Sequence, residues 1–189
     1  VASVVAKRGV KVALTGLGGD ELFGGYPVFR EVGRLQWLAR CPAAFRPLLV
    51  HLGKWGRRIA EMPGDDVSAL VRWRRRFMTD SEAIAAGLPP HPFKADESSA
   101  SLPDDFARVS WAELTSYMRD MLLRDSDQMS MAASLELRVP FLDHELVEYL
   151  LHLPEREKLR QGGIKGLLVA SCQELLPASV YQRPKMGFG

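Results

Sequence analysis

A glycine-rich segment with two adjacent acids, residues 15–26, has the composition of a turn that binds a phosphate or a purine. It reads Thr-Gly-Leu-Gly-Gly-Asp-Glu-Leu-Phe-Gly-Gly-Tyr and directly follows a short apolar run. Glycines let backbone amides approach a ligand closely. Asp20 and Glu21 would open the next helix, where the helix dipole stabilises an acid, or Asp20 would hold a Mg²⁺ ion that carries nucleotide phosphates. A tight strand-to-helix turn explains these residues equally well, so spacing alone leaves both interpretations open.

Two opposite charges, Glu136 and Arg138, lie between apolar neighbours shortly before Pro140. A proline favours extended backbone in the residue before it. Charged side chains in such a stretch are often paired and partly buried. The sequence therefore favours a structural ion pair over the alternative, a pair that orients a substrate.

Lys185 lies among proline and glycine residues in the segment 183–189. A lysine on such a loop can reach into a cleft and neutralise charge that develops on a phosphate. Taken alone, the spacing favours a solvated lysine.

In this order, the three segments resemble the synthetase domain of glutamine-hydrolysing asparagine synthetases. That family has S-G-x-G-x-D-E-x-F-G-G-Y after a strand, then D-x-x-S-M-A-x-S-x-E-x-R-x-P-F-L-D, then R-x-K-x-G-F. The matching residues are 15–26, 127–143 and 183–188. The stretch 153–168, with Lys158 and Lys165, is also typical of the family. Three ordered motifs are far more specific than any one of them.

The resemblance implies an ATP-dependent amide ligase with ATP and Mg²⁺ as cofactors. In this family the β-carboxylate of aspartate attacks the α-phosphorus of ATP, giving β-aspartyl-AMP and pyrophosphate. Ammonia from an N-terminal glutaminase domain then displaces AMP and yields asparagine. By motif position, the resemblance assigns catalysis to Lys185 and Glu136, and ATP binding to Thr15, Gly16, Gly18 and Gly19. The acceptor pocket would be bordered by Leu17 and Arg138. Asp20 would hold the metal ion and the pyrophosphate.

Leu17 departs from the family pattern, in which glutamate is the commonest residue at this place near the acyl-adenylate. A leucine cannot accept a hydrogen bond from a substrate ammonium or from ammonia. Two alternatives therefore stay open: a divergent member that amidates or cyclises another carboxylic acid, and an inactive helical interaction module. Thr15 replaces the family's serine and keeps its hydroxyl.

The elements that position these residues begin with a short buried strand, expected at 11–15. A helix end before it, with Gly9 as C-cap, indicates half of a crossover unit in a parallel sheet. No later segment shows the pattern of a second buried strand, so the other strands are expected upstream. We expect 1–26 to end a nucleotide-binding α/β unit and 27–189 to form the helical C-terminal part of the synthetase domain. The resemblance implies a parent domain of the adenine nucleotide α-hydrolase-like α/β type.

Two family elements are absent from these residues: the S-G-G-x-D-S pyrophosphate loop and the glutaminase domain with its N-terminal cysteine. Without that loop, most of the triphosphate lacks a cradle. We expect residues 1–189 alone to be inactive.

Apolar residues at three- and four-residue spacing predict a mainly α-helical chain. Asp143 should cap a helix that ends before Pro154, and residues 87–105 should form a loop. Four methionines, at 118, 121, 129 and 131, are expected to fill gaps in the core. The expected helices span residues 27–40, 43–60, 66–78, 107–124, 144–152 and 164–176, with a further helix that begins near 126.

The composition favours neither nucleic acid nor a membrane as a partner. The net charge is +2, and no apolar run reaches the roughly 18 residues of a membrane span. The basic cluster Arg72, Arg74, Arg75 and Arg76 is more often a solvated helix face than an RNA site. Two cysteines and the lack of an apolar leader favour a cytoplasmic protein. The uncovered edge of a lone strand leaves room for a homodimer.

Overall fold

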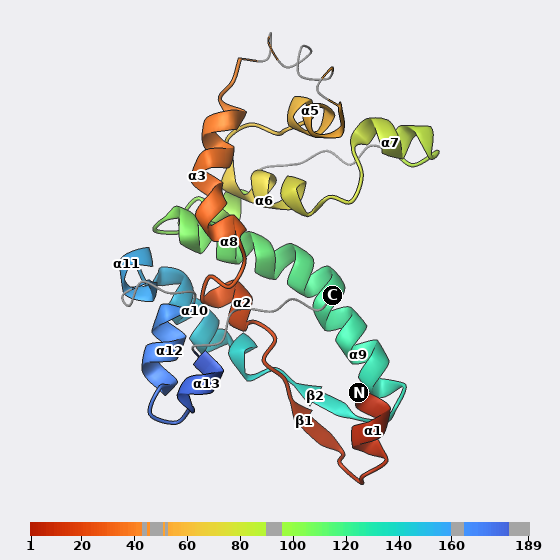
Figure 1. The fold of residues 1–189 in the computed structure, drawn as a ribbon, viewed down its shortest axis with the longest axis vertical. Helices are drawn as coiled ribbons and strands as arrows, with labels where there is room; N and C mark the ends of the chain where they lie inside the picture. Colours follow the sequence, from red (N-terminus) through yellow and green to blue (C-terminus); the bar gives the residue numbers. More distant parts are fainter. Residues whose placement is uncertain (43–44, 46–50, 52, 90–95, 160–164, 182–189) are drawn as a thin grey trace.

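The computed structural model describes residues 1–42, 45, 51, 53–89, 96–159 and 165–181, which are mostly helical (Figure 1). The first half contains α1 (Ala2–Ala6), β1 (Val12–Leu14), α2 (Gly19–Leu22), α3 (Val28–Ala39), α5 (Gly53–Ala60), α6 (Val67–Arg75) and α7 (Asp80–Ala85). The second half contains η3 (Glu97–Ser99), α8 (Asp105–Glu113), η4 (Leu114–Leu123), α9 (Arg124–Met131), β2 (Glu136–Arg138), η5 (Pro140–Leu142), α10 (His144–His152), α11 (Glu155–Lys158), α12 (Gly166–Cys172) and α13 (Ala178–Tyr181). The prediction of a mainly helical chain with a short parallel-type strand is confirmed.

The strand expected at 11–15 is present as β1, but the expectation that it lacks a partner within this chain is wrong. β1 pairs in parallel with β2, with Val12 opposite Glu136 and Leu14 opposite Arg138. The second strand escapes a search for buried strands because Glu136 and Arg138 are charged and exposed. Its three residues alternate in exposure, as expected when successive side chains point to opposite faces of a sheet.

Three helices, α3, α6 and α8, form the main core, and we call them the helical layer. Asp66 begins α6 and Asp104 begins α8, each by accepting a hydrogen bond from a backbone N–H three residues ahead. The apolar faces of the three helices meet in one buried cluster: Val28, Phe29, Val32, Val67, Val71, Phe106, Val109 and Ala112. The helices predicted at 27–40 and 66–78 are therefore confirmed, with their apolar spacing explained by this core.

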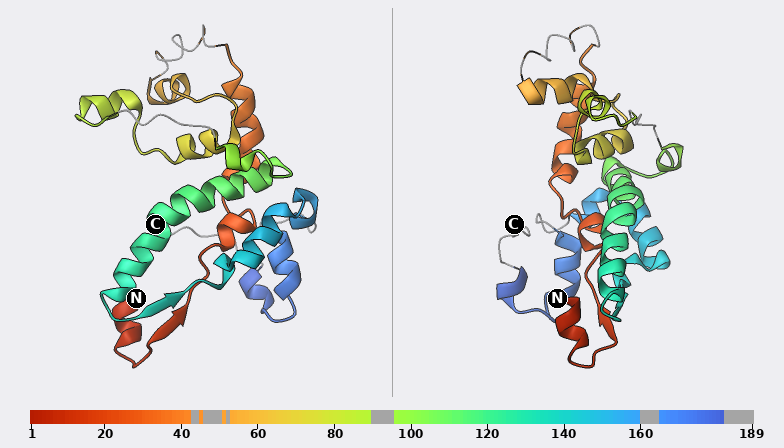
Figure 2. Two further views of the ribbon diagram at one scale, coloured as in Figure 1. Left: turned by 180° about the vertical axis from the view of Figure 1, so that it is seen from behind. Right: turned by 90° about the vertical axis from the view of Figure 1, so that its right-hand side faces the viewer.

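A long helix connects the helical layer to the two strands. It runs through α8, the π-helix η4 and α9 without a break and ends beside α1 and β2 (Figures 1 and 2). Two separate helices, at 107–124 and from 126, were expected here, but they are one. The side chains of Thr115 and Ser116 donate to the carbonyls of Trp111 and Ala112 where the helix changes from α to π. Such back-bonding competes with the regular backbone pattern.

The C-terminal helices pack against the glycine-rich segment. Asp143 caps α10 by accepting from the N–H groups of Glu145 and Leu146, and α10 ends at His152, before Pro154, as predicted. Leu22, Phe23 and Leu150 form a buried cluster that Leu167 and Leu168 of α12 also contact. The cluster fixes α2 against α10 and α12.

Other expectations were met in part. Only α5 represents the helix expected at 43–60, since most of 43–52 lies outside the described residues. The expected loop at 87–105 contains the short helix η3, and residues 90–95 are not described. The helix expected at 164–176 is the shorter α12. In the described residues, no helix is both long and apolar enough to cross a membrane.

Candidate functional site

The first two sequence motifs meet at the carboxyl ends of the two strands. The N–H of Thr15 donates to the carbonyl of Arg138, with a nitrogen–oxygen distance of 2.9 Å, directly beyond the last paired residues. The glycine-rich segment then continues from β1, and residues 139–143 continue from β2. Ligands of parallel sheets bind at this end of the strands. Two segments that lie far apart in the sequence therefore border the same strand ends.

Gly18 shows why glycine is needed at this place. Its φ angle is +95°, and a Cβ atom there would lie 2.7 Å from Cδ2 of Leu142. The neighbouring Gly19 is buried against the ring of Phe141, 3.5 Å from an ideal Cβ position. Phe141 also makes an edge-to-face contact with Phe23, with ring centroids 5.8 Å apart. The Pro-Phe-Leu-Asp part of the second motif thus packs directly on the glycine turn.

Asp20, the predicted metal ligand, is paired with Lys165. The Lys165 ammonium lies 2.9 Å from Oδ1 of Asp20, and both side chains are partly exposed. Lys165 itself has a φ angle of +59° and begins α12. Gly25 leaves room for the aspartate, because a Cβ at Gly25 would clash with the Asp20 carboxylate. The sequence placed Lys165 in a family-typical stretch but gave no signal that it reaches Asp20, since that contact depends on how α12 packs.

Glu21, next to Asp20, points into the protein instead. It is 1% exposed and accepts a hydrogen bond from the hydroxyl of Tyr26, with an oxygen–oxygen distance of 2.7 Å. Burial and this carboxylate raise the pKa of Tyr26 far above its usual value. The two adjacent acids therefore have different environments: Asp20 faces the partly exposed side of the turn, and Glu21 anchors the turn to the core.

The guanidinium of Arg75 lies beside Tyr26. It is 4.4 Å from the centroid of Tyr26 and 4.0 Å from that of Tyr117, and its nitrogens contact both carboxylate oxygens of Glu113 at 2.9–3.1 Å. Glu113 is 1% exposed, and its burial raises the pKa of the carboxyl, an effect that Arg75 opposes. Sequence reasoning missed this group because its members lie far apart in the sequence, at positions 26, 75, 113 and 117.

Glu136 and Arg138 form the ion pair that the sequence favoured, at 2.9 Å. The expected partial burial is wrong: 56% of the Glu136 side chain and 64% of the Arg138 side chain are exposed. Two residues apart on β2, they share one face of the sheet. Their accessibility fits a pair that can meet a substrate as well as one that only meets solvent.

The remaining predicted residues take simple positions. Gly16 is exposed, and Leu17 is partly buried. Lys185 and the rest of the third motif lie outside the described residues. Within the part that the structure describes, no group of three His, Cys, Asp or Glu side chains is arranged to hold a metal ion.

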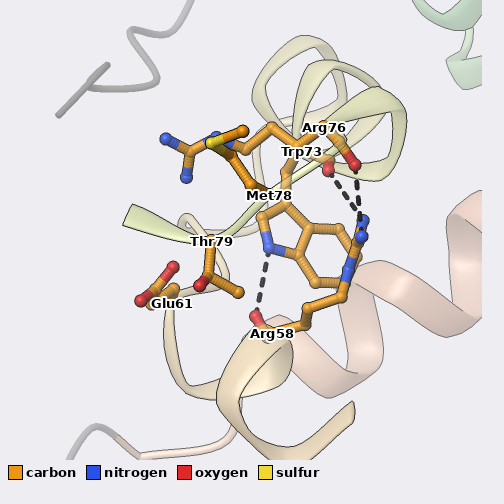
Figure 3. Close-up of a pocket in the computed structure, with 6 residues that line it drawn as sticks. All are labelled: Arg58, Glu61, Trp73, Arg76, Met78 and Thr79. Atoms are coloured by element: carbon orange, nitrogen blue, oxygen red, sulfur yellow. Dashed lines mark hydrogen bonds between the residues drawn. The ribbon is translucent and has the colours of Figure 1, made fainter. Parts of the chain in front are cut away.

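The basic cluster on α6 has internal partners. The four arginines pair with carboxylates of this chain: Arg72 with Asp96, Arg74 with Glu31, Arg75 with Glu113 and Arg76 with Asp80. Figure 3 shows a depression beside this helix, where Arg58 covers the ring of Trp73 and donates to the carbonyls of Trp73 and Arg76. Ion pairs with carboxylates of this chain thus account for the basic cluster.

Comparisons with known proteins agree with the motifs. The family model for asparagine synthase matches residues 1–189. The glutamine-hydrolyzing asparagine synthetase 1 of Bacillus subtilis (strain 168) is 31% identical over an alignment of 202 residues. The alignment covers 97% of this chain and 31% of that protein. A putative glutamine-hydrolyzing asparagine synthetase of Mycobacterium bovis is 31% identical over 199 residues, covering 97% of this chain and 30% of that protein.

A third relative, the glutamine-hydrolyzing asparagine synthetase of Cricetulus griseus, is 36% identical over 102 residues, covering 52% of this chain and 16% of that protein. No solved structure matches the chain. The chain spans less than a third of the length of these curated relatives. Because the family model covers every residue and two motifs of the family meet at the strand ends, this chain belongs to the asparagine synthase family.

Proposed function

We propose that this chain forms part of an ATP-dependent ligase that makes asparagine from aspartate through β-aspartyl-AMP. The observation that carries the proposal is the meeting of the glycine turn and the second motif at the carboxyl ends of β1 and β2. Family membership supports the same class of reaction. In this proposal the turn contributes Thr15, Gly16, Gly18 and Gly19 to ATP binding, because the turn directly follows β1 at the end of the strands where ligands of parallel sheets bind.

Asp20 fits a magnesium ion that arrives with the nucleotide. Mg²⁺ is usually held by one or two carboxylates together with phosphate oxygens and water, so a single partly exposed carboxylate suits it. The ion would neutralise charge on the phosphates. Lys165, now 2.9 Å from Asp20, then provides a second positive charge at the same place. These two side chains hold the pyrophosphate end of ATP in our proposal.

The acceptor side of the reaction falls to Leu17, Glu136, Arg138 and Lys185. The carboxylate of aspartate attacks the α-phosphorus and pyrophosphate leaves; ammonia derived from glutamine then attacks the carbonyl carbon and AMP leaves. Lys185 stabilises the negative charge that builds up on the phosphoryl group. Glu136 and Arg138 present opposite charges on one exposed face, which suits an amino-acid substrate.

Leu17 favours a second candidate, a member that amidates or cyclises another carboxylic acid. Its apolar side chain is partly buried in the turn and offers no acceptor to an amino group. The two candidates share the adenylation step and differ in the acid. A helical module without activity is the third outcome that an experiment must separate.

The test is pyrophosphate release by the full-length protein with ATP and Mg²⁺, with and without aspartate. Release that depends on aspartate supports the first candidate, and release with another carboxylic acid alone supports the second. Asp20→Asn and Lys185→Ala should each reduce kcat by about 100-fold or more, because the first weakens the hold on Mg²⁺ and the second removes a positive charge that stabilises the transition state. Asp65→Asn is the matched control, since Asp65 pairs with Arg40 on the exposed surface. Silence with every acid would leave only the inactive module.

Two further parts of the proposal concern the rest of the protein. The pyrophosphate loop and the glutaminase domain, which supplies ammonia, would come from residues outside 1–189. A protein of residues 1–189 alone should therefore release no pyrophosphate under conditions in which the full-length protein does. Release by the short form would contradict this part.

A further inference from the structure

Arg75 connects one buried carboxylate, Glu113, to the tyrosine that bonds a second, Glu21. Its guanidinium contacts Glu113 through three nitrogen–oxygen approaches of 2.9–3.1 Å. On the other side lies Tyr26, whose hydroxyl donates to Glu21. Glu21 and Glu113 are each 1% exposed, and the charge of Glu21 contributes to the raised pKa of Glu113. A buried carboxylate needs a partner to remain charged. Arg75 is the charged partner of Glu113, and Tyr26, which Arg75 contacts, is the hydrogen-bond partner of Glu21.

The guanidinium of Arg75 also lies over two aromatic rings. Tyr26 and Tyr117 lie over it at 4.4 Å and 4.0 Å from their centroids. The two rings also contact each other edge to face, with centroids 6.5 Å apart and an angle of 78° between their planes. A cation held over aromatic rings is favourable, and most so when water is excluded. The position of Tyr26 is therefore set by Arg75 on one side and by Glu21 on the other.

This contact reaches the glycine turn directly. Tyr26 is the last residue of the first motif, and Glu21 follows Asp20 within α2. A hydrogen bond of 2.7 Å between them closes the segment 21–26 into a loop against the core. Gly24 within it lies so close to Phe106 of α8 that a Cβ would come within 2.8 Å of the ring. Movement of Tyr26 would therefore move the segment that carries Asp20.

The neighbouring arginines of α6 provide the contrast. Arg74 pairs with Glu31 of α3 at 2.7 Å, and both side chains are about 40% exposed. Arg72 pairs with Asp96. These pairs join other elements, whereas Arg75 contacts Tyr26 of the turn. The role of Arg75 thus differs from that of a general surface ion pair.

We propose that Arg75 is a positioning residue that holds the glycine turn in its nucleotide-binding shape through Tyr26 and Glu21. It contacts neither the nucleotide nor the reacting atoms. The inference rests on the proposed function, because it states that the affinity of the glycine turn for ATP depends on Arg75. Loss of Arg75 lets Tyr26 and Glu21 move, so that part of the binding energy of ATP is spent on ordering the turn.

The experiment compares Arg75→Met with Arg74→Met in the full-length protein. Both substitutions remove a charge from the same helix, and only the first removes a contact with the turn. For Arg75→Met we expect the KM for ATP to rise about 10-fold while kcat and the KM for aspartate stay within about 2-fold of the wild type. Arg74→Met should leave all three unchanged. Arg75→Lys keeps the positive charge but lacks the planar guanidinium with its several N–H donors, and it should give a smaller rise in the KM for ATP.

A KM for ATP that stays within about 2-fold of the wild type in correctly folded Arg75→Met overturns the proposal. So does an equal rise in the KM values of both substrates, because that pattern indicates a general structural loss. The failure of the proposed function is seen separately, as a wild-type protein that releases no pyrophosphate with any acid.

In that case amide hydrogen exchange of residues 18–26 in nucleotide-free protein decides the matter. Faster exchange in Arg75→Met than in Arg74→Met supports the positioning role, and equal exchange overturns it. If Arg75→Met fails to fold, Arg75→Lys is compared with Arg74→Lys by the same measurements.

Discussion

The helical layer and the opposite end of the molecule use similar residues in different ways. We call α1, β1, β2 and α9 the sheet end. In the helical layer, Val71 and Val109 are fully buried, whereas 73% of Leu14 and 74% of Met129 are exposed in the sheet end. The ion pairs differ in the same direction: Glu113 is buried beneath Arg75, while Glu136 and Arg138 are open to solvent.

This difference shows which of the two regions buries its apolar side chains within the described residues. Strands of parallel sheets are normally covered on both faces, and β1 with its exposed Leu14 is not. The sheet end therefore exposes apolar surface that a parallel sheet normally buries. The apolar faces of the three helices of the helical layer are buried against one another within the described residues.

The largest expected effect is the loss of a ring from the helical layer. Phe106 is buried beneath Phe29 and Gly24, so Phe106→Ala should lower the free energy of unfolding by about 3–5 kcal/mol. Met129→Ala in the exposed part of α9 should change it by less than about 0.5 kcal/mol. Urea unfolding followed by circular dichroism measures both. Similar losses for the two variants would contradict the contrast between the regions.

A buried lysine gives the next effect. Lys158 is 1% exposed, lies 4.8 Å from the centroid of Phe106, and has no hydrogen-bond partner for its ammonium among the described residues. Burial lowers the pKa of Lys158 to about 8, against 10.5 for an ordinary lysine, although Asp104 and Glu155 favour the charge. The unfolded state therefore binds more protons than the folded state between pH 8 and 10.5, and the stability contribution of this residue rises across that window.

Lys158→Met tests that dependence. The variant should be more stable than the wild type below pH 8, by up to about 3 kcal/mol, because the buried charge is gone. The difference should shrink as the pH rises from 8 to 10.5. Unfolding curves for both proteins at several pH values provide the measurement, and a difference that is constant over this window would sink the explanation.

A glycine substitution has a smaller effect and separates backbone strain from helix propensity. Gly18→Ala places a Cβ at a positive φ angle and against Leu142, so it should cost about 1–2 kcal/mol and raise the KM for ATP. Gly33→Ala lies in α3 with open space around it and should instead stabilise the protein by roughly 0.5–1 kcal/mol. Unfolding and pyrophosphate release are measured for both. Equal signs in the two variants would contradict the need for glycine at 18.

The smallest expected change in stability comes from the exposed pair. Glu136→Gln should alter the free energy of unfolding by less than about 1 kcal/mol, because exposed ion pairs contribute little. If Glu136 acts in the reaction, Glu136→Gln should lower kcat by much more than this small change in stability explains. A stability loss above about 2 kcal/mol in the full-length protein would show that the pair is covered there, so the contrast between the two regions would need revision.

Much of the helical structure could be predicted because it depends on local patterns. The cap at Asp143, the end of α10 before Pro154, and the apolar spacing of α3 and α6 are properties of neighbouring residues. The methionines show the limit of such reasoning. Met118 is buried as expected, but Met121, Met129 and Met131 are largely exposed, so the expectation that they fill the core is wrong. Periodicity identifies a helix face without showing what covers it.

The sequence by itself determined the family, the order of the motifs and the need for glycine in the turn. Those properties lie in residue types at short spacing, such as the glycines at positions 16, 18 and 19. The tertiary structure alone decided that β2 pairs with β1, that Lys165 reaches Asp20, and that Arg75 lies against Tyr26. The physical reason is that each of these contacts joins residues many positions apart, and only the packing of the helices between them brings those residues together.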